Sequence, residues 1–344
     1  MSDDLSPQAA AVQGLMRSDL RGPGITRQPS PTGMAYLDPS GVLVTEPDTL
    51  RRIRALAIPP AWTDVWIAPD PLGHIQATGV DRRGRTQYRY HQLWREQRDA
   101  QKFAHMLRFA GALPGLRTAA ASDLGRLDLD RDRVAAGAVR LIDLGLFRIG
   151  GEKYAELDHH YGATTLLKEH VTVTGDGLRF DYIAKEGKHR QVTVTDPAVL
   201  PTVTALVGSD NGLETLFCYS RDGAWHELHS RDVTGYIAVR AGAHFTAKEF
   251  RTWNATVFMA LALVNAGPSA TARGRKGAIT ASIREVAQWL GDTPAVARSS
   301  YIDPGLISRY ESQGELPGIP VLPPVLPAPP QAEAAVAALL ADRA

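Results

Sequence analysis

Four side chains stand in contexts where together they would transfer a phosphoryl group without a metal ion. A phenolic oxygen can attack a phosphodiester while two guanidinium groups neutralise the oxygens on which charge accumulates. An ammonium group can then protonate the leaving oxygen. The candidates are two arginines, a lysine and a tyrosine: Arg148, Arg251, Lys185 and Tyr301.

Taken singly, three of these residues also have purely structural interpretations. Arg148 ends a helix predicted over 132–149, where a cation favours the helix dipole. Lys185 precedes a tight turn, and exposed lysines are common in turns. Tyr301 stands before an Asp-Pro pair, as half-buried packing tyrosines often do. Only the combination of the residues favours catalysis.

The helix predicted over 246–266 carries the second arginine. Thr246 and Glu249 form a capping box that fixes the helix start. Lys248 and Arg251 lie one turn apart and away from an apolar stripe, so we expect the helix to pack through the apolar side and to present the two cations on another side. Considered alone, such a cationic side would be an ordinary solvent-exposed face. The stripe comprises Phe250, Trp253, Val257, Leu261 and Val264.

The elements that must position these residues fall into two groups. Up to about residue 90 the chain alternates like short strands, with a hairpin over 75–90 after a helix over 51–60 and a first helix over 7–20. Beyond a polar segment over 94–100, expected to be a linker, helical periodicity dominates. Helices are predicted over 101–110, 123–125, 132–149, 197–206, 210–216, 230–239, 246–266 and 281–290, and strands over 172–174, 178–184 and 191–195.

These patterns predict an α+β protein. We expect a small strand-rich domain over 1–97 and a larger, mainly helical domain with a short sheet over 98–315. A proline-rich tail over 316–344 should end in a short helix.

Charge placement says more than the formal net charge of +1. Residues 1–50 carry three basic and six acidic side chains, whereas 51–117 carry twelve basic and five acidic. This local surplus, interleaved with aromatic residues, is typical of a nucleic-acid contact, although charge runs are also found on ordinary solvated faces.

The single cysteine, Cys218, excludes a disulfide framework and a cysteine-based zinc site. No signal peptide is seen at the start of the sequence, and the longest apolar run, near 257–264, is too short to cross a membrane. We therefore expect a soluble cytoplasmic protein.

In order and spacing, the motifs resemble those of type IB DNA topoisomerases, specifically the compact poxvirus-like branch of bacteria, over roughly residues 34–310. The first arginine motif reads Arg-Ile-Gly-Gly-Glu-Lys-Tyr over 148–154, and Lys185 follows on a hairpin. The second reads Lys-Glu-Phe-Arg-Thr-Trp over 248–253. The nucleophile segment runs from Gly291 to Tyr301, and 84–90 resembles a strand that relatives place in the DNA major groove.

The resemblance implies the topoisomerase fold shared with tyrosine recombinases and a monomer that clamps duplex DNA near the nucleoid. Tyr301 would form a 3′-phosphotyrosyl link, Arg148 and Arg251 would hold the nonbridging oxygens, and Lys185 would be the general acid. Supercoils of either sign would relax without ATP, metal or another cofactor. The residues expected to contact DNA are Arg85, Tyr88, Tyr90, Lys153, Tyr154, Lys248, Arg275 and Lys276, the last two in a mobile loop over 273–277.

One position departs from the family. Asp292, the fifth candidate catalytic residue, stands nine residues before Tyr301, where relatives carry His or sometimes Asn as hydrogen-bond donors. An ionised carboxylate has no donor and repels the developing charge. Either Asp292 is protonated on DNA, or it points elsewhere, or cleavage is slow. A straight helix would also hold the two Cα atoms about 13 Å apart, so the chain must bend or Tyr301 must move.

Three rival interpretations remain. A tyrosine recombinase shares the chemistry but normally has His-x-x-Arg where this chain has Lys248-x-x-Arg251. A DNA-binding relative without activity would keep the scaffold alone. A metallohydrolase has little support, because His159 and His160 are adjacent rather than at ligand spacing.

Overall fold

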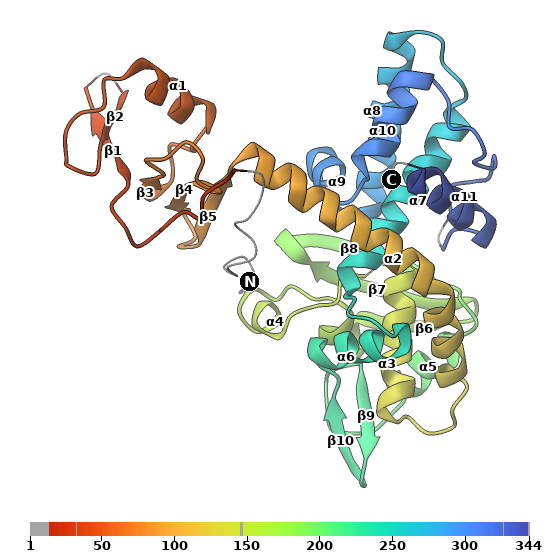
Figure 1. Ribbon diagram of the computed structural model, residues 1–344. Coiled ribbons are helices and arrows are strands. Elements are labelled where there is room, and N and C mark those ends of the chain that lie inside the picture. The colour runs from red at the N-terminus through yellow and green to blue at the C-terminus, as the bar shows by residue number, and fades with distance from the viewer. Residues whose placement is uncertain (1–13, 32, 145–146, 326, 343–344) are drawn as a thin grey trace. The chain divides into compact units, whose positions relative to one another are not determined.

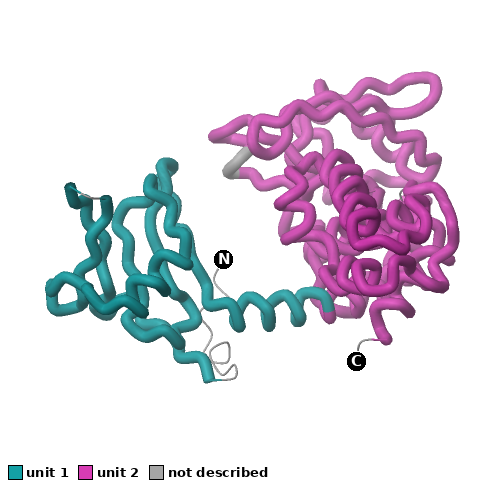
Figure 2. Tube along the Cα trace, turned by 90° about the horizontal axis from the view of Figure 1, so that it is seen from above, with its two compact units in different colours: residues 1–103 teal, residues 104–344 magenta. Residues whose placement is uncertain are grey.

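The computed structural model describes residues 14–31, 33–144, 147–325 and 327–342, apart from the side chains of Lys153 and Tyr154. These residues form two compact units, 1–103 and 104–344, whose boundary falls within one helix (Figure 2). Strands prevail in the first unit and helices in the second, so the predicted α+β class is confirmed.

The first unit is built on an antiparallel sheet. Its strands are β1 (Ile25–Ser30), β2 (Gly33–Leu37), β3 (Thr63–Ile67), β4 (Ile75–Val80) and β5 (Thr86–Tyr90), in the order β2-β1-β3-β4-β5. Helix α1 (Pro47–Ala55) buries Ile53 in a core with Ile25, Val65, Ile67 and Ala77 (Figure 1).

The β4–β5 hairpin confirms the prediction for residues 75–90. Asp81 closes its turn by accepting hydrogen bonds from the backbone N–H groups of Arg83 and Arg85. Gly84 has φ 72°, a conformation that glycine adopts without steric cost.

Helix α2 (Gln92–Leu124) corrects the prediction of a linker, because residues 94–100 lie inside it. It also joins the two helices expected over 101–110 and 123–125. The helix expected over 7–20 falls largely outside the described residues, and 14–20 contain no helix.

The second unit surrounds α7 (Ala247–Ala266), which packs against α3 (Arg131–Asp143), α8 (Ala272–Leu290), α10 (Pro304–Gln313) and α11 (Pro330–Ala341). An antiparallel sheet of β6 (Val171–Thr174), β7 (Gly177–Ala184) and β8 (Lys188–Val194) has the order β6-β7-β8. The remaining elements are α4 (Glu152–Asp158), α5 (Leu200–Val207), β9 (Cys218–Arg221), β10 (Ala224–Glu227), α6 (Ser230–Ala241) and α9 (Pro294–Ser300), with short 3₁₀ turns at Ala163–Thr165, Lys168–His170 and Lys185–Gly187.

Two helix predictions were wrong: one helix is shorter than expected, and the other does not form. The helix expected over 132–149 ends at Asp143, whose carbonyl accepts a 2.8 Å hydrogen bond from the Asn254 side chain. Residues 210–216 are not helical. There Lys168 donates to Ser209 O and Asn211 Oδ1, which favours a loop over a helical turn.

Candidate active site

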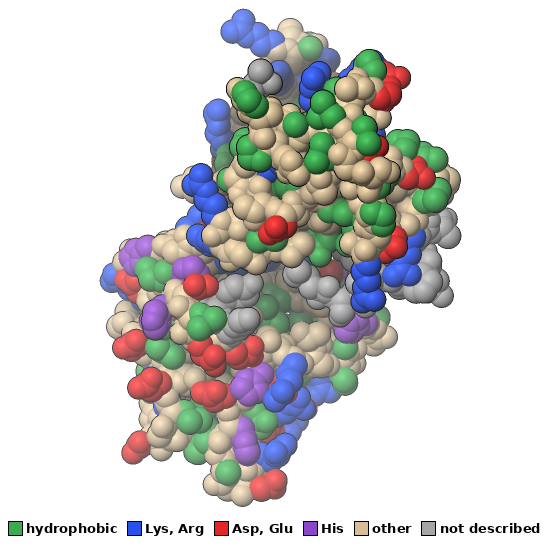
Figure 3. Space-filling model, turned by 90° about the vertical axis from the view of Figure 1, so that its left-hand side faces the viewer, with side chains coloured by type: hydrophobic (Ala, Val, Ile, Leu, Met, Phe, Trp, Pro, Cys, Tyr) green, Lys and Arg blue, Asp and Glu red, His purple; other side chains and the backbone are tan. Residues whose placement is uncertain are grey.

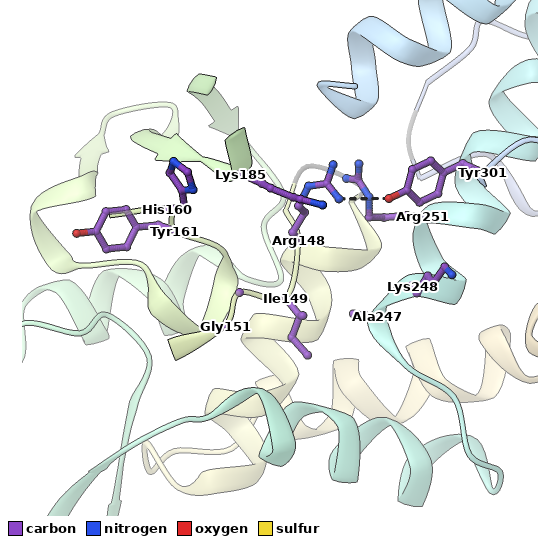
Figure 4. Close-up of a pocket in the computed structure, with 11 residues that line it drawn as sticks. Arg148, Ile149, Gly151, His160, Tyr161, Lys185, Ala247, Lys248, Arg251 and Tyr301 are labelled. Atoms are coloured by element: carbon purple, nitrogen blue, oxygen red, sulfur yellow. Dashed lines mark hydrogen bonds between the residues drawn. The ribbon is translucent and has the colours of Figure 1, made fainter. Parts of the chain in front are cut away.

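Lys185 lies in the turn between β7 and β8, as predicted. The hairpin register ends with Ala184 opposite Lys188, and the 3₁₀ turn η5 (Lys185–Gly187) joins the two strands. Glu186 and Gly187 both have positive φ, which makes the reversal tight. Figure 4 shows the Lys185 ammonium pointing toward the two arginines.

Arg148 is held by its backbone rather than by a helix end. Because α3 ends earlier than predicted, Arg148 lies in a non-helical segment whose carbonyl accepts a 2.8 Å hydrogen bond from Ala163 N. A Cβ atom on Gly162 would lie 2.6 Å from Gly150 Cα, so the two segments touch through glycines. This close contact fixes the segment that presents the guanidinium.

Arg251 comes from the first turns of α7. The predicted capping box is present, with the Glu249 carboxylate accepting a 2.7 Å hydrogen bond from Thr246 N. The predicted cationic face is wrong for Arg251, which is only 4% exposed, whereas Lys248 is exposed. Arg251 is buried because neighbouring helices cover α7 beyond the apolar stripe.

Tyr301 directly follows the short helix α9, which is capped by Thr293. Its carbonyl accepts a 3.2 Å hydrogen bond from the Thr256 hydroxyl of α7, and its side chain is 9% exposed. The chain changes direction at Thr293, so no straight helix separates Asp292 from Tyr301. Both side chains therefore reach the same arginine.

Four of the five predicted catalytic side chains, all except Asp292, line one cavity of about 390 Å³ (Figure 4). Arg148 Nη1 donates a 3.2 Å hydrogen bond to the Tyr301 hydroxyl. The Arg251 guanidinium carbon lies 5.1 Å from the centroid of the Tyr301 ring. A phenol, two guanidinium groups and an ammonium group thus meet in a space that can admit a phosphodiester.

The surroundings also change the acidity of the phenol. Burial raises the pKa of Tyr301, but the positive charges of Arg251 and Arg148 and the Arg148 hydrogen bond outweigh it, so the pKa is lowered. A lowered pKa increases the fraction of phenolate, which is the nucleophilic form.

Asp292 lies between the two arginines instead of pointing elsewhere. Arg148 Nη2 donates to both carboxylate oxygens, at 2.8 and 2.9 Å, and Arg251 Nη2 donates to Oδ2 at 3.0 Å. The Asp292 side chain is only 8% exposed.

Comparisons with known proteins agree with this site. The family model described as the eukaryotic DNA topoisomerase I catalytic core matches residues 91–313, and the bacterial DNA topoisomerase IB N-terminal domain matches 33–81. A DNA topoisomerase 1B of Acanthamoeba polyphaga mimivirus is 30% identical over 288 residues, covering 81% of this chain and 84% of the viral protein. The chain belongs to the type IB DNA topoisomerases. It is therefore an enzyme that acts on DNA, as the motifs predicted.

The other predicted DNA contacts in the second unit of this topoisomerase lie in different settings. Lys248 lines the cavity. The loop expected over 273–277 is instead the first part of α8, where Thr271 caps the helix. Arg275 donates to the carbonyls of Ser269 and Ala270, whereas Lys276 is exposed. The predicted side chains Lys153 and Tyr154 lie outside the described part.

In the first unit of the topoisomerase, β5 forms an edge of the sheet and carries the predicted aromatic contacts. The rings of Tyr88 and Tyr90 stack with centroids 5.9 Å apart, and Tyr88 is 36% exposed. Arg85 forms a 2.7 Å ion pair with Asp81 and remains largely exposed. That arginine holds the pKa of Asp81 at about 2.

Two residues for which the motifs predict no role also line the topoisomerase cavity. They are His160 and Tyr161, which form part of its wall. The tyrosine's backbone N–H donates to Ile183 O on the hairpin that carries Lys185, a pairing with no local signal in the sequence. Among the described residues there is no group of three potential metal ligands and no helix long and apolar enough to cross a membrane.

Proposed function

We propose that Tyr301 is the nucleophile of this topoisomerase. Tyr301 loses its phenolic proton to water, its oxygen attacks a backbone phosphorus to form a 3′-phosphotyrosyl bond, and the bond from phosphorus to the 5′-oxygen breaks. The observation that carries this proposal is the hydrogen bond from Arg148 to the Tyr301 hydroxyl inside the cavity shared with Arg251 and Lys185.

The other three side chains divide the remaining work. Arg148 and Arg251 bind the nonbridging oxygens, where negative charge grows as the bonds rearrange. The Arg251 Nε atom is buried without a hydrogen-bond partner among the described residues, which leaves one unsatisfied N–H group on this arginine. Lys185 gives its proton to the departing 5′-oxygen, leaving a 5′-hydroxyl.

Religation is the reverse reaction. The 5′-hydroxyl returns its proton to Lys185 and attacks the phosphotyrosine, and Tyr301 leaves as a phenolate that regains its proton from water. The phosphotyrosyl bond conserves the energy of the broken linkage, so no ATP is needed. While the strand is open its free end rotates, which relaxes positive and negative supercoils alike.

The proposal also covers the enzyme's oligomeric state, its DNA partner and its location in the cell. It acts as a monomer on duplex DNA, in the cytoplasm near the nucleoid, without a metal or other cofactor. The predicted contacts of both units, from Tyr88 and Tyr90 to Lys248 and Lys276, hold the DNA backbone and grooves. Support comes from the exposure of Tyr88, Lys248 and Lys276.

Plasmid relaxation in EDTA without nucleotide tests the mechanism. We expect the wild type to relax both positively and negatively supercoiled plasmid, and Tyr301→Phe to be inactive because it lacks the attacking oxygen. Denaturation with SDS should trap an adduct whose nucleotide maps to Tyr301. An adduct on another residue, or a strict requirement for a divalent ion, would refute the proposal.

A further inference from the structure

The two arginines proposed to bind the scissile phosphate already hold an anion. The Asp292 carboxylate receives three hydrogen bonds of 2.8–3.0 Å, two from Arg148 Nη2 and one from Arg251 Nη2. These charge-assisted bonds are the kind that a nonbridging phosphate oxygen would accept. A carboxylate and a phosphate therefore use the same donors.

The Nη2 groups of both arginines are fully engaged. Arg148 Nη1 is engaged with the Tyr301 hydroxyl, and Arg251 Nη2 also donates to Leu290 O at 3.0 Å. Arg251 Nε has no partner among the described residues. A phosphate that arrives while Asp292 keeps its bonds is denied the Nη2 donors of both arginines and meets a second negative charge beside it.

The backbone of Asp292 is fixed, so the segment cannot easily withdraw. Asp292 N donates to Ala287 O at 2.9 Å, and Gly291 adopts a left-handed conformation at the end of α8. From the β7–β8 hairpin, Lys188 Nζ donates a 2.9 Å hydrogen bond to Gly291 O. Release of the Nη2 groups therefore needs rotation of the Asp292 side chain or movement of the arginine side chains.

From this geometry we infer that Asp292 is an internal competitor of the scissile phosphate. The inference rests on the proposed function. The carboxylate holds Arg148 and Arg251 in the free enzyme and must yield their Nη2 groups before the phosphate is fully bound. It thereby slows cleavage and sets how readily a DNA phosphate is accepted.

Replacing Asp292 by a neutral residue and by a charged residue shows whether its carboxylate competes with the phosphate or only supports the two arginines. Asp292→Asn keeps an oxygen acceptor for an arginine, removes the charge and adds an N–H donor toward the phosphate. We expect its single-turnover cleavage of a duplex to be about tenfold faster or more, the scale of one charge-assisted hydrogen bond. Asp292→Glu keeps the charge and should not be faster than the wild type.

A second measurement does not depend on catalysis. Inorganic phosphate should raise the melting temperature of Asp292→Asn more than that of the wild type, at ionic strength matched with chloride, because the variant has no carboxylate charge competing for the Nη2 donors. Asp196→Asn is the matched control, since it removes another carboxylate that pairs with an arginine, Arg140, outside the cavity. It should gain neither cleavage rate nor phosphate binding.

The outcomes are distinct. Slower or unchanged cleavage by a folded Asp292→Asn variant would mean that the carboxylate aligns the arginines instead of competing, and would overturn the inference. If Asp292→Asn melts far below the wild type, Asp292→His is used in its place, and its single-turnover cleavage and its stabilisation by phosphate are measured in the same way. Adduct formation by Tyr301→Phe would refute the proposed function instead, whatever the Asp292 variants do.

Discussion

The acidity of one phenol depends on two neighbouring cations. Tyr301 is nearly buried, and burial alone disfavours the phenolate. Arg251, beside the ring, and Arg148, bonded to the hydroxyl, reverse that preference. The same contact raises the pKa of Arg148 against the opposing effect of burial, so the cation is retained where it is needed.

We predict that Tyr301 ionises at lower pH than an ordinary tyrosine, whose pKa is about 10. Because the pKa is lowered, phenolate forms as pH rises toward that value and is lost as pH falls. NMR titration of ¹³C-labelled tyrosines, with the signal assigned by its absence in Tyr301→Phe, measures this directly.

Two comparisons check the cause of that shift. Arg148→Gln should return the Tyr301 pKa toward 10 and slow cleavage about 100-fold, the scale of a lost oxyanion donor. Tyr236 serves as an internal control, because burial and its 2.6 Å bond to Asp123 raise its pKa. A Tyr301 signal that titrates with that of Tyr236 would contradict the electrostatic explanation.

At the scale of residues, the sequence predicted four side chains that line one cavity but not the contacts between them. Arg148, Lys185, Arg251 and Tyr301 were predicted from motif order, and all four line one cavity. The ion pairs of Asp292 join positions 144 and 41 residues apart. Such distances leave no local pattern, so only the fold reveals which groups share a hydrogen bond.

At the scale of elements, local signals succeeded where they were self-contained. The hairpins over 75–90 and 178–195 and the capped start of α7 follow from turn residues and a capping box. The end of α3 could not be predicted from local signals, because the side chain of the distant residue Asn254 donates a hydrogen bond to the carbonyl of Asp143. Tertiary hydrogen bonds therefore decide element boundaries that periodicity leaves open.

The C-terminal helix α11 is tied to the helix that carries Arg251. Glu333 of α11 accepts hydrogen bonds from Arg117 at 2.7 and 3.0 Å and from the Trp253 indole at 3.3 Å. Trp253 is 1% exposed and lies two residues beyond Arg251. This helix lies beyond the matched catalytic core, which ends at residue 313.

Glu333→Gln should destabilise the protein by about 1–3 kcal/mol, because a largely buried Arg117 then loses one of its two carboxylate partners. Urea unfolding measures the loss. Glu315→Gln, at an exposed position near the start of the tail, is the control and should stay within about 0.5 kcal/mol of the wild type. Equal stability of both variants would show that the α11 contact contributes nothing.

At the scale of the whole molecule, the near-zero net charge conceals how the charges are placed. Acidic and basic side chains are interspersed on the face shown in Figure 3, and the formal net charge is +1. DNA affinity therefore has to come from particular cations rather than from a uniform field. Each cation that neutralises a phosphate releases counterions, which makes binding depend on salt.

We predict that the Kd of Tyr301→Phe for duplex DNA rises steeply with KCl, with a log–log slope that reports the number of phosphate contacts, about 0.9 for each. The exposed cations Lys248 and Lys276 should each account for about one unit of that slope, so alanine at either position flattens it by that amount. Arg126 is already paired with Asp130 on the surface of the second unit, and Arg126→Ala should leave the slope unchanged. Fluorescence anisotropy across a KCl series measures all four proteins, and identical slopes would remove both lysines from the DNA interface.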